Sequence, residues 1–363
     1  MKIAINALPY HSYQGIENFL ANITRHWPYN DKDEIVVFAN DISAQFLIPL
    51  PNFIKLKIIK FKKISKLSIF IFQQYNFIKL LKKEKIDVLF CASLNCPWLY
   101  KRKIVTIHDA APFIIKAEVN NLGRAYWRLS LFFIKHFSLH FITVSNFSKQ
   151  ELIEKLYFKK NSIDIIYNGT PTIKNKNIIK KPPVTSPYII VIGNARPRKN
   201  LETLIKATHL INQEQNTIKL IIIGKADKKM KIIEQKYKNQ FIQFTGFISD
   251  NQKFRLLAHA KALIFPSLYE GFGIPILEAQ SLNIPVICSA IPAFKEIGGE
   301  SVLFFDAFSH KDLKNKIKIL LNNTTISDAL KIKGAQNIKR FNWKNSSKKL
   351  SEIIHQYENP PNK

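Results

Sequence analysis

The chain has 363 residues, 46% of them apolar, so it is long enough for two packed domains and too apolar to be disordered. Lysine and arginine outnumber aspartate and glutamate by 55 to 26, and the net charge of +29 favours polyanionic partners: nucleic acid, phospholipid headgroups or diphosphate-bearing substrates. A solvated lysine surface that only reflects biased composition is the alternative. The three cysteines, Cys91, Cys96 and Cys288, lack metal-ligand spacing and exclude a fully paired disulfide framework within the chain, which favours a reducing cytoplasm.

The chain begins with an apolar segment at 2–8 that has the length of a strand and lacks the basic and long apolar regions of a signal peptide. A longer apolar span at 127–144 is interrupted by charged and histidine side chains such as Arg128 and Lys135. A charge near the centre of a bilayer is costly. We therefore expect no transmembrane helix and a cytoplasmic location.

Short apolar segments recur in the first half of the chain, each followed by a longer segment with helical periodicity. They lie at 2–8, 34–40, 86–93, 103–108, 140–145 and 163–167. This alternation predicts a mostly parallel sheet covered by helices on both faces. The pattern stops near Pro171, and the segment 171–187, rich in lysine, asparagine and proline, is interpreted as a linker.

A second series of strands follows, predicted at 188–192, 218–224, 241–245, 261–266, 285–289 and 301–305. The end of the chain has the apolar spacing of an amphipathic helix. We therefore expect an α/β protein with two doubly wound domains at 1–170 and 188–340, and a C-terminal helix and tail at 341–363. Ligands of such sheets bind beyond the carboxyl ends of the strands, which predicts a site in the cleft between the two domains.

The densest group of candidate functional residues follows the predicted strand at 261–266. Gly271 and Gly273 allow close approach of the backbone to a ligand, and Pro275 suits the first turn of a helix whose N–H groups would face an anion. A sugar diphosphate fits such a place.

Two carboxylates accompany this loop. Glu270 lies before the helix and Glu278 about one turn inside it, so they can reach different parts of one ligand, one holding sugar hydroxyls and the other ribose hydroxyls. The alternative for Glu278 is that it only complements the helix dipole.

The segment from Glu270 to Glu278, with 285–289 after it, closely resembles the donor-site signature of glycosyltransferase family 4, and the likeness covers most of 100–306. It implies the GT-B fold, with two Rossmann-like domains facing a central cleft. By position, it implies that Glu270 contacts the transferred sugar and that Glu278 contacts the nucleotide ribose. The amides of Gly271, Phe272 and Gly273 would contact the sugar and the diphosphate.

A second segment, 191–200, resembles the turn in which this family holds the donor diphosphate with an arginine and a lysine. Lys199 matches the lysine, but Asn194 stands where many members have the arginine, so Arg198 is taken as the second cation, with Arg196 as the alternative. Such cations stabilise the charge that develops on a departing nucleoside diphosphate. A merely solvated lysine here is disfavoured because it opposes the dipole of the following helix.

In the first domain, His108 and Asp109 end a predicted strand and resemble the family's His-Asp motif. The resemblance implies that His108 hydrogen-bonds the donor sugar near the reacting carbon and that Asp109 orients it or caps the next turn. A lone histidine at a strand end is otherwise more often structural. Gly15 opens the first helix and is similar to a shortened form of the family's glycine loop, where amides would approach the diphosphate and the acceptor.

The Asp-x-Asp at 31–33 lies in a polar turn, and we assign no metal site there or elsewhere. The segment 60–85 interleaves lysines with aromatic and aliphatic residues. It predicts either a basic amphipathic helix on an anionic membrane surface or an ordinary helix with a buried aromatic face.

The resemblance implies a retaining, metal-independent hexosyltransferase without a cofactor. Its donor would be a GDP- or UDP-linked sugar, and its acceptor a glycan or lipid-linked saccharide of lipopolysaccharide, O-antigen or capsule. Similar chains often use GDP-mannose, which suggests a mannosyltransferase, cytoplasmic or peripheral on the inner face of the membrane. The alternatives are a GT-B nucleotide-sugar epimerase or phosphorylase, and a protein that binds nucleic acid or other polyanions. No nucleic-acid-binding motif accompanies the charge, so nucleic acid is not an expected partner.

Overall fold

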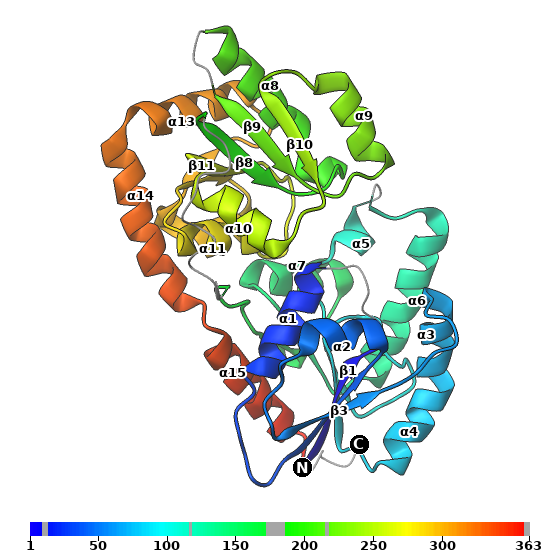
Figure 1. The fold of residues 1–363 in the computed structure, drawn as a ribbon. Coiled ribbons are helices and arrows are strands. Elements are labelled where there is room, and N and C mark those ends of the chain that lie inside the picture. The colour runs from blue at the N-terminus through cyan, green and yellow to red at the C-terminus, as the bar shows by residue number, and fades with distance from the viewer. Residues whose placement is uncertain (9–13, 116–117, 172–185, 215–217, 359–363) are drawn as a thin grey trace. The chain divides into compact units, whose positions relative to one another are not determined.

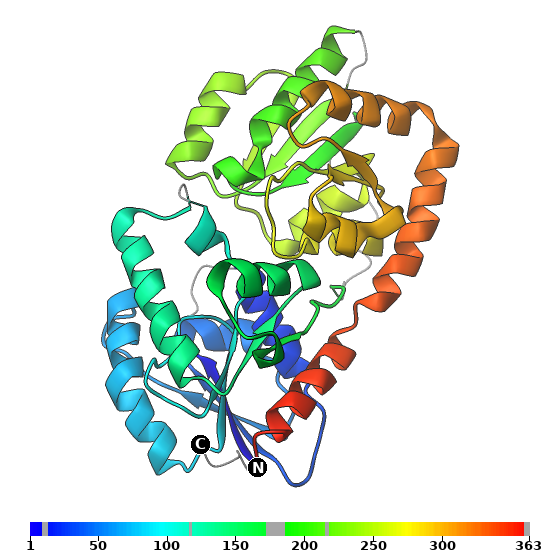
Figure 2. The same cartoon turned by 180° about the vertical axis from the view of Figure 1, so that it is seen from behind.

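The structure, a computed structural model, describes residues 1–8, 14–115, 118–171, 186–214 and 218–358. It divides into two compact units, the first made of Met1–Gly169 and Asn342–Lys363 and the second of Thr170–Phe341. Figures 1 and 2 show both units. Within the segment predicted as a linker, 172–185 lies outside the described residues.

The first unit is built on a parallel sheet in the order β3-β2-β1-β4-β5-β6-β7. Its strands are β1 Lys2–Ala7, β2 Glu34–Ala39, β3 Ile54–Ile58, β4 Val88–Cys91, β5 Lys103–Thr106, β6 His140–Thr143 and β7 Ile163–Ile165. All strands predicted for this half are confirmed, each within a few residues of its expected ends. The direction of the order reverses between β1 and β4, which is the switch point of a Rossmann-like sheet.

Strand β3 was not predicted from the sequence. It alternates isoleucine or leucine with Lys55 and Lys57, and it pairs with β2 at the edge of the sheet. Its lysines form ion pairs with Glu34 and Glu84. Charged side chains are common on edge strands because they discourage pairing with other chains, but they also hide the strand from a search for continuous apolar segments.

Helices cover both faces of this sheet, several of them with side-chain caps that fix where they begin. They are α1 Gln14–Arg25, α2 Asp41–Leu47, α3 Lys66–Phe72, α4 Ile78–Lys83, α5 Ala111–Ile114, α6 Asn121–Phe137 and α7 Asn146–Leu156. A π-helical turn, η1 Gln73–Phe77, joins α3 to α4. Asn40 and Ser65 form capping boxes at the starts of α2 and α3, and Ser145 caps α7 through the amide of Ser148.

The last helix, α15 Trp343–His355, also belongs to the first unit, where it lies beside α1 (Figure 1). Leu350 and Ile354 are fully buried. Ser346 donates a hydrogen bond to the carbonyl of Tyr167 at 2.7 Å, and Nε2 of His355 lies 3.0 Å from the carboxylate of Asp33. The predicted amphipathic helix is therefore confirmed, and it packs on the unit that contains the start of the chain.

The second unit has a parallel sheet in the order β10-β9-β8-β11-β12-β13, again with a reversal of direction, here between β8 and β11. Its strands are β8 Tyr188–Ile192, β9 Lys219–Ile223, β10 Ile242–Gly246, β11 Ala262–Phe265, β12 Val286–Ser289 and β13 Leu303–Phe305. Its helices are α8 Leu201–Gln213, α9 Lys228–Tyr237, α10 Asp250–Ala258, α11 Ile274–Ser281, α12 Pro292–Gly298, α13 His310–Asn322 and α14 Thr324–Asn337. The strands predicted for this half are confirmed.

Alternate residues of these strands enter two separate cores. Ile189 and Val191 of β8 pack with one buried cluster, and Tyr188 and Ile190 of the same strand pack with another. Because helices cover both sides of the sheet, its strands are apolar on both faces. Such a strand is a continuous apolar segment in the sequence. This arrangement leaves the carboxyl ends of the strands as the place for a ligand.

No helix among the described residues is both long and apolar enough to cross a membrane. The longest, α6, has 17 residues and carries Arg124, Arg128 and Lys135.

Candidate functional site

Two loops meet at the switch point of the second unit. The first leaves β8 and passes through the short 3-10 helix η5 Pro197–Lys199 to α8, and the second leaves the neighbouring strand β11 and leads to α11. The amide of Leu268 donates to the carbonyl of Arg198 at 2.7 Å. Asn200, in the left-handed region with φ of 54°, donates from its side chain to the carbonyls of Pro266 and Ala307. The bonds to Arg198 and Pro266 fix the two loops against each other, and the bond to Ala307 joins Asn200 to the segment after β13.

The two loops bring together an ion cluster of Glu270, Lys199 and Arg198. Nζ of Lys199 lies 2.5 Å from Oε1 of Glu270, and a guanidinium nitrogen of Arg198 lies 3.2 Å from Oε2. The three side chains are only 12–15% exposed. Burial raises the pKa of Glu270, but the charges of Lys199 and Arg198 outweigh it and hold that pKa below its ordinary value. Glu270 is therefore a carboxylate with a cation on each oxygen.

The sequence offered two arginines, Arg198 and Arg196, as the second cation for the donor diphosphate. Arg198 lies in the ion cluster and also donates to the carbonyl of Tyr269 at 3.0 Å, whereas the side chain of Arg196 is exposed. The geometry therefore favours Arg198.

The loop after Glu270 turns sharply into α11. Gly273 has φ of 130°, and a Cβ at this position would lie 3.2–3.3 Å from Ile276 and Phe294, so a glycine is required here. Pro275 occupies the first turn of α11, as predicted, and no side chain caps the start of this helix. Gly271 and Phe272 are buried beside it. The arrangement is suited to an anion, because the first amides of a helix carry partial positive charge.

Glu278, inside α11, has a partner that no motif indicated. Oε1 of Glu278 lies 2.7 Å from Nζ of Lys253 in α10, and the two side chains are 6% and 13% exposed. Lys253 also contacts Asp250 at 3.1 Å. Lysine is common in this sequence, so only the tertiary structure distinguishes Lys253 from the rest.

In the first unit, His108 follows β5 and is held in one orientation. Its Nε2 lies 2.9 Å from the carbonyl of Ala92, and its ring meets that of Phe19 edge-on at 5.1 Å. Burial lowers the pKa of His108 to about 4, although the bond to Ala92 opposes this. His108 is therefore neutral near pH 7, with Nε2–H donating to Ala92 and Nδ1 as an acceptor.

Asp109 accepts a hydrogen bond from the amide of Ala111 at 3.0 Å, so it contributes to the cap of α5. Gly15 lies in the first turn of α1, where a Cβ would meet no atom within 4 Å. Packing within the described residues therefore does not require a glycine at 15, and residues 9–13 before it lie outside them.

The Asp-x-Asp turn has a structural role in this unit. Asp33 contacts the terminal amine of Met1 at 3.5 Å and His355 of α15 at 3.0 Å. Across the described ranges, no three His, Cys, Asp or Glu side chains are grouped to hold a metal ion.

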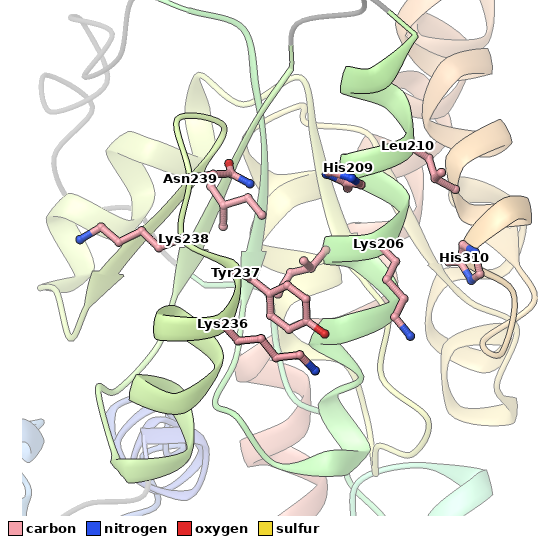
Figure 3. Close-up of a pocket in the computed structure, with 10 residues that line it drawn as sticks. Lys206, His209, Leu210, Lys236, Tyr237, Lys238, Asn239 and His310 are labelled. Carbon is pink, nitrogen blue, oxygen red and sulfur yellow. The ribbon is translucent and has the colours of Figure 1, made fainter.

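Helix α8 also borders a surface pocket of about 380 Å³, shown in Figure 3. Lys206, Lys236 and Tyr237 are among its lining residues, and none of the candidate donor-binding residues is. We assign this pocket no part in the candidate site.

Two family models match the chain. The model described as Glycosyltransferase Family 4 matches residues 13–173, and the model described as Glycosyl transferases group 1 matches residues 173–337.

Two curated relatives have related names. The O-antigen chain mannosyltransferase RfbU of Salmonella typhimurium is 26% identical over 276 residues, which cover 75% of each chain. The O-antigen chain mannosyltransferase B of Escherichia coli is 27% identical over 278 residues, covering 72% of this chain and 71% of the other. Among solved structures, Anabaena Alr3699/HepE in complex with UDP-glucose has a TM-score of 0.72 and 17% identity, over 98% of this chain and all of that one. The structural likeness shows the fold alone.

Proposed function

Because the chain belongs to glycosyltransferase family 4 and is a glycosyltransferase with the GT-B fold, we propose that it transfers a hexose from a nucleoside diphosphate sugar to a growing cell-surface glycan. The observation that carries this proposal is the buried ion cluster of Glu270, Lys199 and Arg198 at the switch point of the second unit.

Lys199 and Arg198 are assigned to the donor diphosphate. A diphosphate is the kind of anion that two neighbouring cations and a helix N-terminus bind best. Without a ligand, Glu270 neutralises part of this charge. When the diphosphate enters, it takes over one or both cations, which leaves Glu270 to accept hydrogen bonds from the sugar. The amides of Gly271, Phe272 and Gly273 complete the contact with sugar and diphosphate.

We assign retention of the anomeric configuration by attack on the same face as the leaving group. The resemblance to the family implies this course, in which Glu270 holds the sugar by hydrogen bonds and forms no covalent bond with it. The C–O bond to the diphosphate breaks as the acceptor hydroxyl approaches, and a diphosphate oxygen accepts the proton of that hydroxyl. Lys199 and Arg198 stabilise the charge left on the diphosphate and supply the role that a metal ion has in other transferases.

The neutral state of His108 suits a hydrogen bond with a sugar hydroxyl. Since Nε2–H is directed to Ala92, Nδ1 is the nitrogen that accepts from the hydroxyl. The names of the relatives favour mannose as the transferred hexose and an O-antigen saccharide as the acceptor. GDP is the proposed carrier because similar chains of this family often use GDP-mannose.

Nucleotide binding tests this function directly. Purified protein is titrated with UDP and GDP in the presence of EDTA, and its thermal unfolding is followed. One nucleotide is expected to stabilise the protein by about 2.7 kcal/mol at a concentration one hundred times its Kd. The Glu278→Ala variant should lose this response because the ribose loses its acceptor.

Either of two results would contradict the proposal: a protein that responds to neither nucleotide, or a response that appears only when Mg²⁺ is added. Stabilisation by polynucleotides alone, with steep salt dependence, would instead favour the polyanion-binding alternative.

We also propose that the first unit meets an anionic membrane surface through two neighbouring helices, α3 and α6 (Figures 1 and 2). Phe70 of α3 contacts Tyr126 of α6 with ring centroids 5.9 Å apart. The predicted burial of the aromatic face is therefore partly confirmed. Six large apolar side chains nevertheless remain exposed on α3, η1 and α6, and we call them the apolar stripe: Leu67, Ile71, Tyr75, Leu122, Leu129 and Phe132.

Charge around the apolar stripe favours anionic lipid over a protein partner of mixed charge. Residues 42–83 and 119–150 contain no aspartate or glutamate, although the chain has 26 of them. Lys63 and Lys66 stand at the start of α3 and Arg128 on α6, all with exposed side chains. Basic residues near an anionic bilayer contribute about 1 kcal/mol each, and exposed apolar side chains add to this by insertion.

Vesicle flotation tests the membrane proposal. Binding to vesicles of phosphatidylglycerol and phosphatidylcholine is expected, with little binding to phosphatidylcholine alone. The double variant Leu67→Ser, Ile71→Ser should bind several-fold more weakly, while Ile232→Ser, equally exposed but on α9, should bind as the wild type does. Equal binding by all three proteins would contradict a role for the apolar stripe.

A further inference from the structure

Lys253 lies in the first turn of α10, which begins at Asp250 after a capping box made by Ser249 and Gln252. This helix packs against α11, which carries Glu278. The contact between Nζ of Lys253 and Oε1 of Glu278 is 2.7 Å long and almost fully removed from solvent. Both residues lie in the second unit, so this ion pair forms entirely within that unit.

Stability alone does not account for a lysine at this position. Removing two charges from water costs several kcal/mol, and a well-packed apolar pair of similar volume is often as stable or more so. A cation in the first turn of a helix also opposes the helix dipole. Asp250 offsets part of this cost, but its own side chain is 62% exposed, so solvent weakens that contact.

The contact does define which oxygen of Glu278 carries a cation. Burial lowers the pKa of Lys253, but Glu278 and Asp250 outweigh it, so the pKa is raised and the lysine stays a cation. The ammonium group of Lys253 lies on Oε1 of Glu278, and the other oxygen of this carboxylate is Oε2.

We propose that Lys253 is a positioning residue for the donor nucleotide: by holding Oε1 of Glu278, it directs Oε2 to accept hydrogen bonds from the ribose hydroxyls. This inference rests on the proposed function, in which Glu278 contacts the ribose. It adds a requirement that the family motif does not contain, namely a cation on α10 that makes the glutamate selective for a ribose with both hydroxyls.

The experiment compares two ligands that differ only in these hydroxyls. Binding of UDP and GDP, and of their 2′,3′-dideoxy counterparts, is measured by calorimetry for the wild type, Lys253→Met, Lys253→Arg and Glu278→Gln. Lys253→Met is expected to weaken binding of the ribonucleotide about tenfold, the effect of losing a hydrogen bond to a charged group. Binding of the dideoxynucleotide should stay unchanged.

Three variants separate positioning from packing. Lys253→Arg keeps the cation and should recover most of the preference for the ribonucleotide. The double variant Lys253→Met, Glu278→Gln should bind no more weakly than Glu278→Gln alone, because both changes remove one interaction. Lys228→Met, a change of an exposed lysine at the start of the neighbouring helix α9, is the matched control and should behave as the wild type does.

An equal loss for both ligands in Lys253→Met, or no loss for either, would overturn the positioning role and leave the proposed function standing. If Lys253→Met does not fold, the comparison of ribonucleotide with dideoxynucleotide is made with Lys253→Arg and Glu278→Gln, and equal preferences in the wild type and Glu278→Gln overturn the proposal. Failure of the wild type to bind any nucleotide would overturn the proposed function and this inference together.

Discussion

Replacing Lys199 with alanine is expected to lower kcat for sugar transfer by about a hundredfold or more. The departing diphosphate gains negative charge in the transition state, and Lys199 is one of two buried cations assigned to it. Preorganised charge in a site shielded from water acts more strongly on the transition state than on the bound donor, so kcat should fall more than KM rises.

The same change also affects the protein without substrate. Among the described residues, Glu270 would then keep the cation Arg198 alone. Its pKa should move upward, because less positive charge would offset the effect of burial. Circular dichroism and thermal unfolding of Lys199→Ala therefore have to accompany the kinetics.

Steady-state rates with the nucleotide sugar found by titration check this prediction. Lys206→Ala is the matched control, because Lys206 is an exposed lysine on α8, the helix that follows Lys199, and it is outside the ion cluster. A folded Lys199→Ala protein with kcat within a few-fold of the wild type would contradict the assignment of Lys199 to the leaving group. An equal loss of kcat in Lys199→Ala and Lys206→Ala would indicate that the positive charge of the unit as a whole matters, and not the ion cluster.

Replacing Leu350 with alanine is expected to destabilise the first unit by about 2–5 kcal/mol. Leu350 is fully buried where α15 packs on this unit, with Ile354 also buried beside it. The change removes apolar contacts and leaves a cavity that the surrounding helices fill only in part. Lys348→Ala on the same helix, with a side chain 71% exposed, should change the free energy of unfolding by less than about 0.5 kcal/mol.

Tryptophan fluorescence during urea unfolding measures this effect selectively. The four tryptophans of the chain, Trp27, Trp98, Trp127 and Trp343, all belong to the first unit. Their fluorescence therefore reports that unit, while far-ultraviolet circular dichroism reports both. Leu350→Ala should move the fluorescence transition to lower urea concentration. An unchanged fluorescence transition would contradict the attachment of α15 to the first unit.

The sequence by itself determined the α/β class, the strands other than β3, and the family. Strands buried on both faces are continuous apolar segments, so they are visible without a structure, and their alternation with helical segments implies parallel sheets. The loop from Glu270 to Gly273 was also recognisable, because a backbone with φ of 130° at Gly273 and a proline in the first turn of α11 restrict the choice of residues.

Other features were decided only by tertiary structure. Strand β3 is half polar because it lies at a sheet edge, so its pattern resembles that of a surface segment. The choice of Arg198 over Arg196 depended on which side chain reaches Glu270, and sequence spacing does not contain that distance. Lys253 and Glu278 lie 25 residues apart on two different helices. Because the chain is rich in lysine, its sequence does not indicate which lysine pairs with Glu278. Helix α15 was predictable from its periodicity, but an apolar face does not specify its partner, and only packing decided that it covers the first unit.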